Sequence, residues 1–322
     1  MVAAANVSRV ASSRLHRDYK FTAKVASLQY VSDSAPGILR IKKGTGFSYR
    51  FSSGELVKSK DILIRIKKLV IPPAWKNVWI SDKADGHIQA TGFDVRNRKQ
   101  YKYHPQWSEV RNQTKFHRLL EFGKHLPALR KKIEADLGSS SLSKDKVLAT
   151  IVSLMEKTFI RVGNSEYEKL YGSYGLTTLK DGHVKINGGT IAFSFKGKKG
   201  IHHAISLKNK RLAKIVKACR DIPGKELFQY INEQGERCTV DSGMVNNYIR
   251  EATGNDFTAK DFRTWAGSLT VLSCFKNLGP CESEPQVKKN VVAALDEVSM
   301  KLGNTRTVCR KILCAPWNRE TV

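Results

Sequence analysis

The residues most suited to chemistry begin with a stretch in which cations and aromatic rings alternate. Residues 96–104 read Arg-Asn-Arg-Lys-Gln-Tyr-Lys-Tyr-His. Cationic side chains neutralise phosphates, a glutamine amide can pair with an adenine edge, and tyrosine can stack or hydrogen-bond to phosphate. The stretch therefore favours contact with nucleic acid, with Gln100, Tyr101 and Tyr103 as candidate contact residues. The alternative is an exposed edge strand that its charges keep soluble.

Three further cations stand where the chain is expected to turn. Arg161 lies beside a glycine-containing helix end, Lys198 lies on a glycine-flanked turn between two strand-like runs, and Arg263 lies near a helix start. An arginine beside glycine can reach a phosphate without crowding, and a lysine on a turn can donate a proton from a movable arm. The segment Leu302-Gly303-Asn304-Thr305 begins a new turn after a helix end. Each pattern alone is weak, because such residues are common at helix ends and hairpin tips.

The charge balance indicates a polyanionic partner. The 322 residues include 56 Lys and Arg against 29 Asp and Glu, a formal net charge of +27. An excess on this scale points first to nucleic acid, and the alternative is a solvated basic surface. Hydrophobic residues make up 41% and aromatic residues 9%, which excludes a disordered basic tail. No run approaches the roughly 18 apolar residues of a membrane span.

The cysteines and the first residues bear on the compartment. All six cysteines follow residue 200, and they form neither a CxxC pair nor a Cys/His cluster at zinc spacing. We therefore expect free thiols, mostly buried, in a reducing compartment, and no metal site. Residues 1–17 hold three Arg and no acid. They favour a frayed basic N-terminus over a targeting segment.

Periodicity divides the chain into a β-rich part and a helical part. A helix over 61–70 must stop at Pro72-Pro73, because proline lacks the amide donor. After residue 107 the pattern is helical, Ser143 is a good N-cap, and Gly303 suits the end of a helix over 287–302. Strand-like runs in the β-rich part are 28–31, 38–42, 47–51, 78–81 and 87–91. Strands embedded in the helical part are 184–186, 191–195 and 201–207, with hairpin dipeptides Asp181-Gly182 and Asn187-Gly188.

These patterns predict an α+β fold in three parts. They are a flexible basic N-terminus (1–27), a β-rich domain (28–107) and a larger, mainly helical domain with an embedded three-stranded sheet (108–322).

Taken in order, the segments resemble the type IB DNA topoisomerases of the small poxvirus and bacterial kind, and the bacterial branch in particular. The resemblance runs from Tyr30-Val31-Ser32-Asp33 through Ile71-Pro72-Pro73-Ala74-Trp75 to Leu302-Gly303-Asn304-Thr305. It implies a β-rich DNA-binding domain and a helical catalytic domain that together clamp duplex DNA. It also implies relaxation of supercoils through a 3′-phosphotyrosyl intermediate, without metal or ATP. The implied setting is a monomer without an obligate protein partner or membrane, in the bacterial cytoplasm at the nucleoid.

The resemblance assigns a role to each candidate residue. Arg161 and Arg263 would clamp the non-bridging oxygens of the scissile phosphate. Lys198 would protonate the leaving 5′ oxygen, with the other lysines of that turn as alternatives, and Asn304 would donate a hydrogen bond to a non-bridging oxygen. Arg161, Lys198 and Arg263 are therefore expected to converge on one phosphate-sized site. The implied DNA contacts are Gln100, Tyr101, Tyr103 and Tyr167.

One position departs from the family pattern. The nucleophilic tyrosine of the family lies nine residues after the Asn304 position, where this chain has Leu313, and no tyrosine follows Tyr248. Leucine has no nucleophilic atom, so the chain as given is expected not to cleave DNA by the family mechanism. The alternative function is a non-cleaving clamp on duplex DNA. A tyrosine recombinase is a more distant reading, against which the β-rich N-terminal part argues.

The genetic code offers an origin for this departure. If Lys311 is encoded AAA and Ile312 ATC, removal of one adenine shifts the following codons to a frame that permits Ser-Tyr-Val-His-Pro. That is the family's segment around its nucleophile. We interpret residues 312–322 as a frameshift product, and a diverged tail on a genuine clamp is the alternative.

Overall fold

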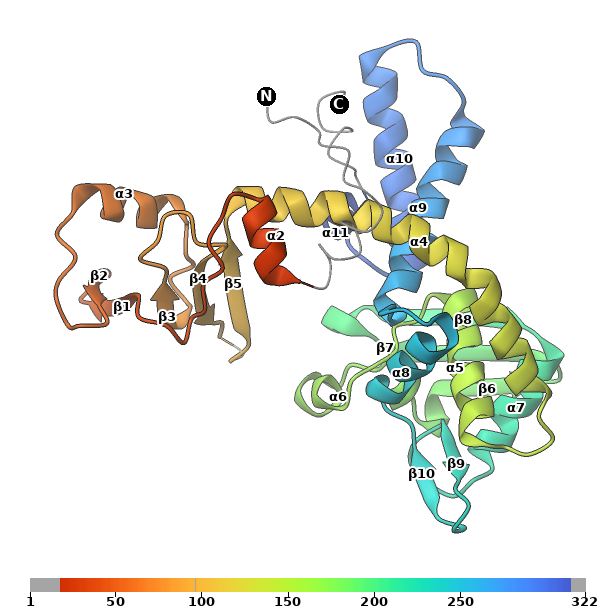
Figure 1. The fold of residues 1–322 in the computed structure, drawn as a ribbon. Coiled ribbons are helices and arrows are strands. Elements are labelled where there is room, and N and C mark those ends of the chain that lie inside the picture. Colours follow the sequence, from red (N-terminus) through yellow and green to blue (C-terminus); the bar gives the residue numbers. More distant parts are fainter. Residues whose placement is uncertain (1–17, 96, 314–322) are drawn as a thin grey trace. The chain divides into compact units, whose positions relative to one another are not determined.

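The computed structural model describes residues 18–95 and 97–313, apart from the side chains of residues 113–117 and 311–313. The chain divides into two compact units, residues 1–118 and 119–322. The dividing point lies inside the long helix α4 (Pro105–Gly138) (Figure 1). Both units combine helices with small antiparallel sheets, which confirms the predicted α+β class.

The first unit is built on a five-stranded antiparallel sheet with the strand order β2-β1-β3-β4-β5. Its strands are β1 (Ile38–Lys43), β2 (Gly46–Phe51), β3 (Lys76–Ile80), β4 (Ile88–Phe93) and β5 (Lys99–Tyr103). Ile38, Ile80 and Ala90 form its core with Ile66 of helix α3 (Lys60–Lys68). Because β2 and β5 end the strand order, they are the two edges of this sheet.

Three predictions for this unit need correction. The helix predicted over 61–70 is α3, which ends at Lys68, and Val70 already has a φ of +47°. Residues 28–31 form no strand; Gln29 makes only an isolated bridge to Gly86. Residues predicted to be flexible form helix α2 (Tyr19–Val25), because Asp18 caps it by accepting the amide hydrogen of Phe21.

The second unit is a helical body with a three-stranded antiparallel sheet, ordered β6-β7-β8, and a two-stranded ribbon of β9 and β10. Helix α5 is its centre, with ten of fifteen residues buried, and its N-cap Ser143 accepts the amide hydrogen of Lys146. The helices are α5 (Lys144–Thr158), α6 (Ser165–Tyr171), α7 (Lys210–Arg220), α8 (Ser242–Thr253), α9 (Ala259–Leu278), α10 (Glu284–Leu302) and α11 (Arg306–Leu313). The strands are β6 (Val184–Asn187), β7 (Thr190–Lys196), β8 (His202–Lys208), β9 (Gln229–Ile231) and β10 (Arg237–Thr239).

The turns of this unit show where local signals held. Helix α10 ends at Gly303, whose left-handed φ of +55° is the conformation expected of a C′ glycine. Asn187-Gly188 does lie at a hairpin, between β6 and β7. Asp181-Gly182 does not connect two strands; it forms the 3₁₀ turn η2 (Asp181–His183), because no strand precedes it.

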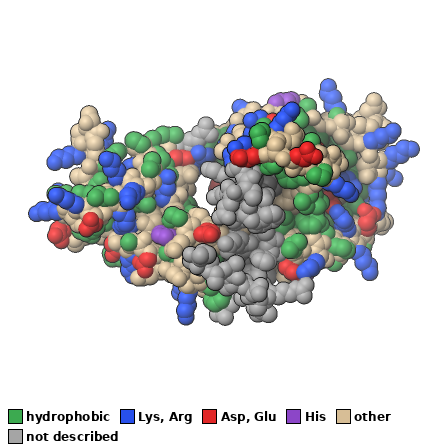
Figure 2. Space-filling view, turned by 90° about the horizontal axis from the view of Figure 1, so that it is seen from above, with side chains coloured by type: hydrophobic (Ala, Val, Ile, Leu, Met, Phe, Trp, Pro, Cys, Tyr) green, Lys and Arg blue, Asp and Glu red, His purple; other side chains and the backbone are tan. Residues whose placement is uncertain are grey.

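The described surface is rich in cations, and the described side chains form no metal site. Figure 2 shows Lys and Arg side chains over the surfaces of both units. Among the described residues, no cluster of three or more His, Cys, Asp or Glu side chains could hold a metal ion, and the five described cysteines are free. No helix in the described ranges is long and apolar enough to cross a membrane.

Candidate phosphate-binding site

A cavity of about 500 Å³ opens in the second unit where several elements end. Its cationic lining residues come from distant parts of the sequence and are Arg161, Lys198, Lys199, Lys260 and Arg263. Asn304 and Tyr167 line it as well. No Asp or Glu is among its lining residues in the described part of the chain. A concave site with cations and no carboxylate attracts an anion.

Arg161 is placed by the end of helix α5. The helix stops at Phe159, a left-handed residue with φ +57°, and the chain then passes through Gly163 at φ +101°. Gly163 packs so closely on the backbone of Gly175 that a Cβ atom there would lie 3.1 Å from the Gly175 carbonyl carbon. This tight crossing directs Arg161 into the cavity.

Arg263 reaches the same place from the start of helix α9. A capping box between Thr258 and Asp261 fixes that helix start. Phe262 is buried in the core, so Arg263 points the other way, towards the cavity. Its guanidinium donates to the carbonyl oxygen of Phe159, and to that of Leu302 at 2.5 Å. Two helix ends are therefore tied together through one arginine.

Asn304 joins the two guanidiniums. Its Oδ1 accepts a hydrogen bond from Arg161 and lies 3.5 Å from Nη2 of Arg263. Arg161 also donates to the Gly303 carbonyl oxygen at 3.4 Å. One neutral oxygen thus holds both cations in register without neutralising either of them.

The electrostatics of this pair favour a bound anion. Burial, followed by the charge of Arg161, lowers the pKa of Arg263 to about 9. Burial also lowers the pKa of Arg161. Both guanidiniums remain protonated at neutral pH, so two like charges stand side by side. An anion between them would relieve that repulsion.

Lys198 and Tyr167 line the cavity from a less buried side. Lys198 is exposed on the 3₁₀ turn η3 (Lys198–Gly200) between β7 and β8, and its Nζ lies 5.7 Å from the ring centroid of Tyr167. Tyr167 belongs to α6, a helix with no buried residue. An ion pair of 2.8 Å between Glu168 of α6 and Lys180 fastens that helix to the rest of the unit.

His203 packs between the turn that carries Lys198 and the end of helix α10. A Cβ atom added at Gly197 would lie 2.5 Å from its Cδ2, and one at Gly303 would also overlap the ring. The ring stacks on Phe195 with centroids 5.1 Å apart. Burial lowers the pKa of His203, and the charges of Arg161 and Arg263 lower it further. A neutral ring therefore fills the space that two glycines leave open, next to both Lys198 and Asn304.

The other predicted DNA contacts lie in the first unit, on the edge strand β5. Tyr101 and Tyr103 are exposed on one face, with ring centroids 5.8 Å apart and planes 8° from parallel. Gln100 points to the other face, where its Nε2 donates to Asp94 at 3.1 Å. Arg96, the first residue of the cationic stretch, lies outside the described residues.

Helix α11 begins beside the cavity, which its residue Val308 lines. Cys309 of α11 is fully buried, and its thiol is hydrogen-bonded to Asn304 and close to the charges of Arg161 and Arg263. Burial nevertheless raises the pKa of this thiol. Leu313 is the last residue of α11 and follows Cys309 by about one helical turn.

Comparison with known proteins identifies the family. The model of the eukaryotic DNA topoisomerase I catalytic core matches residues 102–316, and that of the bacterial DNA topoisomerase IB N-terminal domain matches residues 46–94. DNA topoisomerase 1B of Acanthamoeba polyphaga mimivirus is 36% identical over 284 residues, which cover 85% of this chain and 84% of that protein. The chain belongs to the type IB DNA topoisomerases.

More distant relatives agree with this assignment. DNA topoisomerase 1B of Vaccinia virus (strain Copenhagen) is 26% identical over 236 residues, or 72% of this chain and 71% of that protein. Among solved structures, a XerH site-specific recombinase bound to a palindromic difH substrate covers 59% of this chain and 48% of its own. Its TM-score is 0.37 at 16% identity, a match too loose to support a conclusion. The resemblance found in the sequence to small type IB topoisomerases is therefore confirmed.

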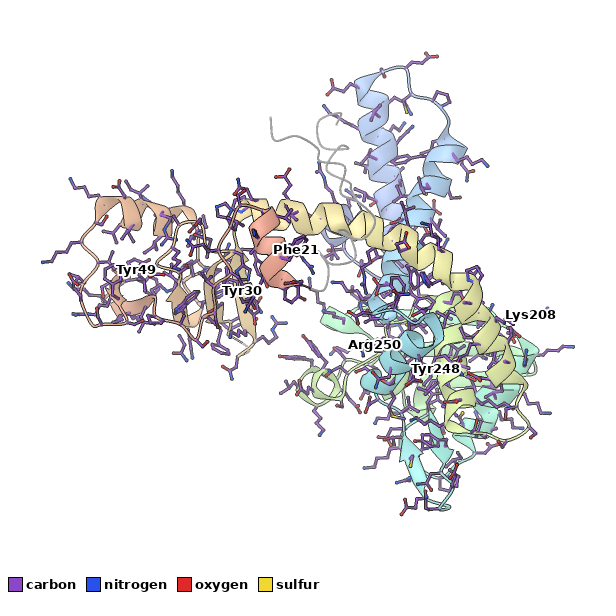
Figure 3. The ribbon with its side chains drawn as sticks, viewed as in Figure 1. Phe21, Tyr30, Tyr49, Lys208, Tyr248 and Arg250 are labelled. Carbon is purple, nitrogen blue, oxygen red and sulfur yellow. The ribbon has the colours of Figure 1, made fainter. Side chains whose placement is uncertain are left out.

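Sequence reasoning missed several residues in and around this cavity. Lys260 lines the cavity and stands three residues before Arg263, so a search for cations beside the predicted arginines would have found it. Nothing in the local sequence marks His203, because its partners Gly197 and Gly303 are brought together only by the fold. Tyr248, the last tyrosine of the chain and labelled in Figure 3, is buried and donates to Asp136 at 2.5 Å, and it is not among the lining residues of the cavity.

Proposed function

We propose that the chain binds duplex DNA, holds one phosphodiester in the cavity of the second unit, and in its present sequence does not cut that bond. The observation that carries the proposal is the guanidinium pair of Arg161 and Arg263. Both are fixed by backbone carbonyls and by Asn304, and no lining carboxylate opposes them in the described part of the chain. Preorganised cations of this kind stabilise the charge that develops on a phosphate under attack.

The family reaction gives each residue a step. A tyrosine oxygen attacks phosphorus, a phosphotyrosyl bond to the 3′ strand end forms, and the bond to the 5′ oxygen breaks. Arg161 and Arg263 hold the two non-bridging oxygens with planar donor forks. Lys198, exposed on its turn, gives its proton to the leaving 5′ oxygen as general acid. Asn304 keeps the arginines in register and donates to the phosphate, and Tyr167 contacts DNA beside it.

This chain lacks the attacking tyrosine of the family reaction. Position 313, at the end of α11, holds leucine. Tyr167 and Tyr174 are the tyrosines that line the cavity, and Tyr174 packs its ring on His183 at 4.3 Å. The function supported best is therefore a DNA clamp of topoisomerase ancestry, derived from an active enzyme by a shift of frame after Lys311. Most of the tail that carries this interpretation, residues 314–322, lies outside the described residues.

The proposal is tested by relaxation of supercoiled plasmid without metal or ATP. The chain as it stands is compared with a repaired chain, I312S/L313Y/C314V/A315H, that carries the segment of the shifted frame. A matched control, I312S/L313F/C314V/A315H, differs from the repaired chain by one hydroxyl. We expect relaxation by the repaired chain alone.

Relaxation by the unchanged chain would show that another residue attacks the phosphate, and Tyr167 and Tyr174 would be examined first. Tight duplex binding with no relaxation by the repaired chain would support a diverged clamp and contradict the frameshift. Resequencing the 3′ end of the gene gives an independent answer. An in-frame ATC codon with no tyrosine in the shifted reading would contradict the frameshift.

Duplex affinity should fall steeply with salt. The net charge of +27 indicates many phosphate contacts. If roughly six to ten phosphates are neutralised, a plot of log K against log salt should have a slope of roughly −5 to −9. Fluorescence anisotropy with a labelled duplex measures this slope. A flat salt response would contradict binding through the phosphate backbone.

A further inference from the structure

Helix α3 lies at the surface of the first unit, and its inner side holds it to the sheet (Figure 1). Ile66 is buried in the core of this unit, and Ile62 and Leu69 pack beside it. Arg65 also points inwards, where it donates to Oε1 of Gln89 at 2.9 Å. These contacts attach the helix, so the residues of its outer side are not needed for that purpose.

The outer side of α3 combines aliphatic side chains with lysines. Lys60, Leu63, Ile64 and Lys67 have the i, i+3, i+4, i+7 spacing of one helix face, which puts the two aliphatic side chains between two ammonium groups. Leu63 and Ile64 are 36% and 53% exposed. The exposed lysines of the helix and its start are Lys58, Lys60, Lys67 and Lys68. Among the described residues, none of these lysines has a carboxylate partner.

Val70, which follows the C-cap residue Leu69 of this helix, is exposed at a conformational cost. Its φ is +47° and its side chain is 74% exposed. Glycine or asparagine usually takes this position, because a β-branched residue is strained in the left-handed region. The sequence thus keeps an aliphatic side chain in water where glycine would be less strained. Strained residues of this kind cluster at binding sites, so Val70 independently indicates a docking surface.

This helix covers the face of the sheet opposite to the one that carries Tyr101. Tyr101 of β5 is paired with Thr91 of β4, so both side chains lie on one face. Ala90, the residue before Thr91, points to the other face and packs in the core with Ile66 of α3. A duplex that contacts the Tyr101 face therefore does not account for the residues on the outer side of α3.

Charge complementarity narrows the choice of occupant. Residues 1–17 carry three Arg and no acid, and residues 314–322 carry one Arg and one Glu, so neither segment complements four lysines. A second copy in a symmetric pair would set the same lysines against each other. Phosphates would pair with the lysines but offer no apolar surface to Leu63, Ile64 and Val70. A protein segment with both apolar and acidic side chains satisfies all of these groups.

We propose that the outer face of α3 docks an acidic amphipathic helix of another protein. An apolar stripe on that helix would cover Leu63 and Ile64 and reach Val70, and its carboxylates would pair with the flanking lysines. We call the docking surface the α3 face; it consists of Lys60, Leu63, Ile64, Lys67, Lys68 and Val70. The proposal does not rest on the phosphate cavity, so it and the proposed function can fail independently.

The test uses the full chain and two labelled peptides of about 18 residues in anisotropy titrations at about 0.15 M salt. One peptide has leucine along a single helix face and glutamate elsewhere. The other has the same composition in an order that scatters the leucines around the helix. The first should bind at least about tenfold more tightly, because only it can cover the aliphatic side chains. Equal affinity would show that charge alone attracts the peptides, and it would overturn the proposal, as would no binding of the first peptide at about 1 mM.

Variants of the aliphatic side chains separate docking from folding. Leu63→Ser combined with Ile64→Ser should lower the affinity for the first peptide by at least about tenfold. Val70→Gly should also lower it, by about threefold, yet should not lower Tm, because glycine relieves the strain at positive φ. Ile41→Thr, at a position that is 42% exposed on the other face of the sheet, is the matched control and should bind like the parent. Unchanged affinity in the Leu63 and Ile64 double variant would overturn the proposal.

Lysine variants separate a protein partner from DNA. Lys60→Gln combined with Lys67→Gln should lower peptide affinity by about tenfold and duplex affinity by less than about twofold. Lys210→Gln combined with Lys214→Gln removes the same charge from α7 and should leave peptide affinity within about twofold. The first peptide should stay bound when duplex DNA is added to saturation. Displacement of the peptide by duplex, with an equal loss of duplex affinity in the Lys60 and Lys67 variant, would assign the α3 face to DNA and overturn the proposal.

Discussion

The two sides of the cavity are held in different ways. Arg161 and Arg263 are tied to the carbonyls of Phe159, Leu302 and Gly303 and share one amide oxygen of Asn304. On the other side, Lys198 stands exposed on a turn, and Tyr167 belongs to a helix with no buried residue. Under the proposed function, the two arginines are a rigid receptor for phosphate charge, and Lys198 is a proton donor able to move towards it. Such a division suits a reaction in which charge develops at a fixed place and the donor approaches only when DNA is bound.

The largest effect is expected on the movable side. Lys198→Ala in the repaired chain should slow plasmid relaxation by about 10²- to 10⁴-fold, the usual range for loss of a general acid. Duplex affinity should change far less, because one exposed lysine among many cations is removed. Lys196→Ala is the matched control. An equal loss of rate in that control would move the proton donor to another lysine of the hairpin.

The rigid side should tolerate no change of donor shape. Arg263→Lys in the repaired chain keeps the charge but loses the planar fork that reaches both helix ends. We expect relaxation to fall by about 10²- to 10³-fold, as when a preorganised donor is removed. If the Arg263→Lys variant relaxes plasmid at nearly the parental rate, the charge alone is needed at this position. The contrast between a rigid arginine side and a movable Lys198 side would then weaken.

A smaller effect is expected where His203 meets both sides. Gly303→Ala must adopt φ +55° and overlap the His203 ring, so it should cost about 2–4 kcal/mol of unfolding free energy. Gly254→Ala is the control, because Gly254 also ends a helix in the left-handed region but has open space around it. It should cost only about 1 kcal/mol.

Adding His203→Ala to Gly303→Ala should recover the part of the loss that comes from overlap, measured as a double-mutant cycle in urea. Additive losses would show that the ring and the glycine do not interact.

The smallest effect is expected at the ion pair between Glu168 and Lys180, which links α6 to the rest of the unit. Glu168→Gln removes the carboxylate charge that pairs with Lys180. Because the pair is partly exposed, the loss of unfolding free energy should be only about 0.2–1 kcal/mol. Hydrogen exchange of α6 amides should nevertheless become faster, since no buried side chain holds that helix. Unchanged exchange would mean that α6 is held by other contacts.

Capping residues and turn dipeptides predicted many of the helix and strand ends. They predicted few of the contacts between residues that are distant in the sequence. Ser143 and Gly303 marked helix ends correctly, because caps are set by neighbouring backbone groups. Asp181-Gly182 was misread as a hairpin, since a turn dipeptide does not reveal whether strands flank it. Asn304 bonds to Arg161, 143 residues away, and His203 packs against Gly303, and no local pattern encodes either contact. The arginines themselves were found through the family resemblance.

The central claim is that the cavity holds a phosphodiester within reach of position 313. Trapping with detergent tests it most directly. Each chain is incubated with duplex DNA labelled at the 5′ end of the strand that is cut, because the fragment upstream of the cut is the one that becomes joined to the tyrosine. The mixture is then denatured in SDS and run on a gel. The account predicts a covalent protein–DNA adduct with the repaired chain and none with either the phenylalanine control or the unchanged chain. An adduct with the unchanged chain, or none with a repaired chain that relaxes plasmid, would contradict it.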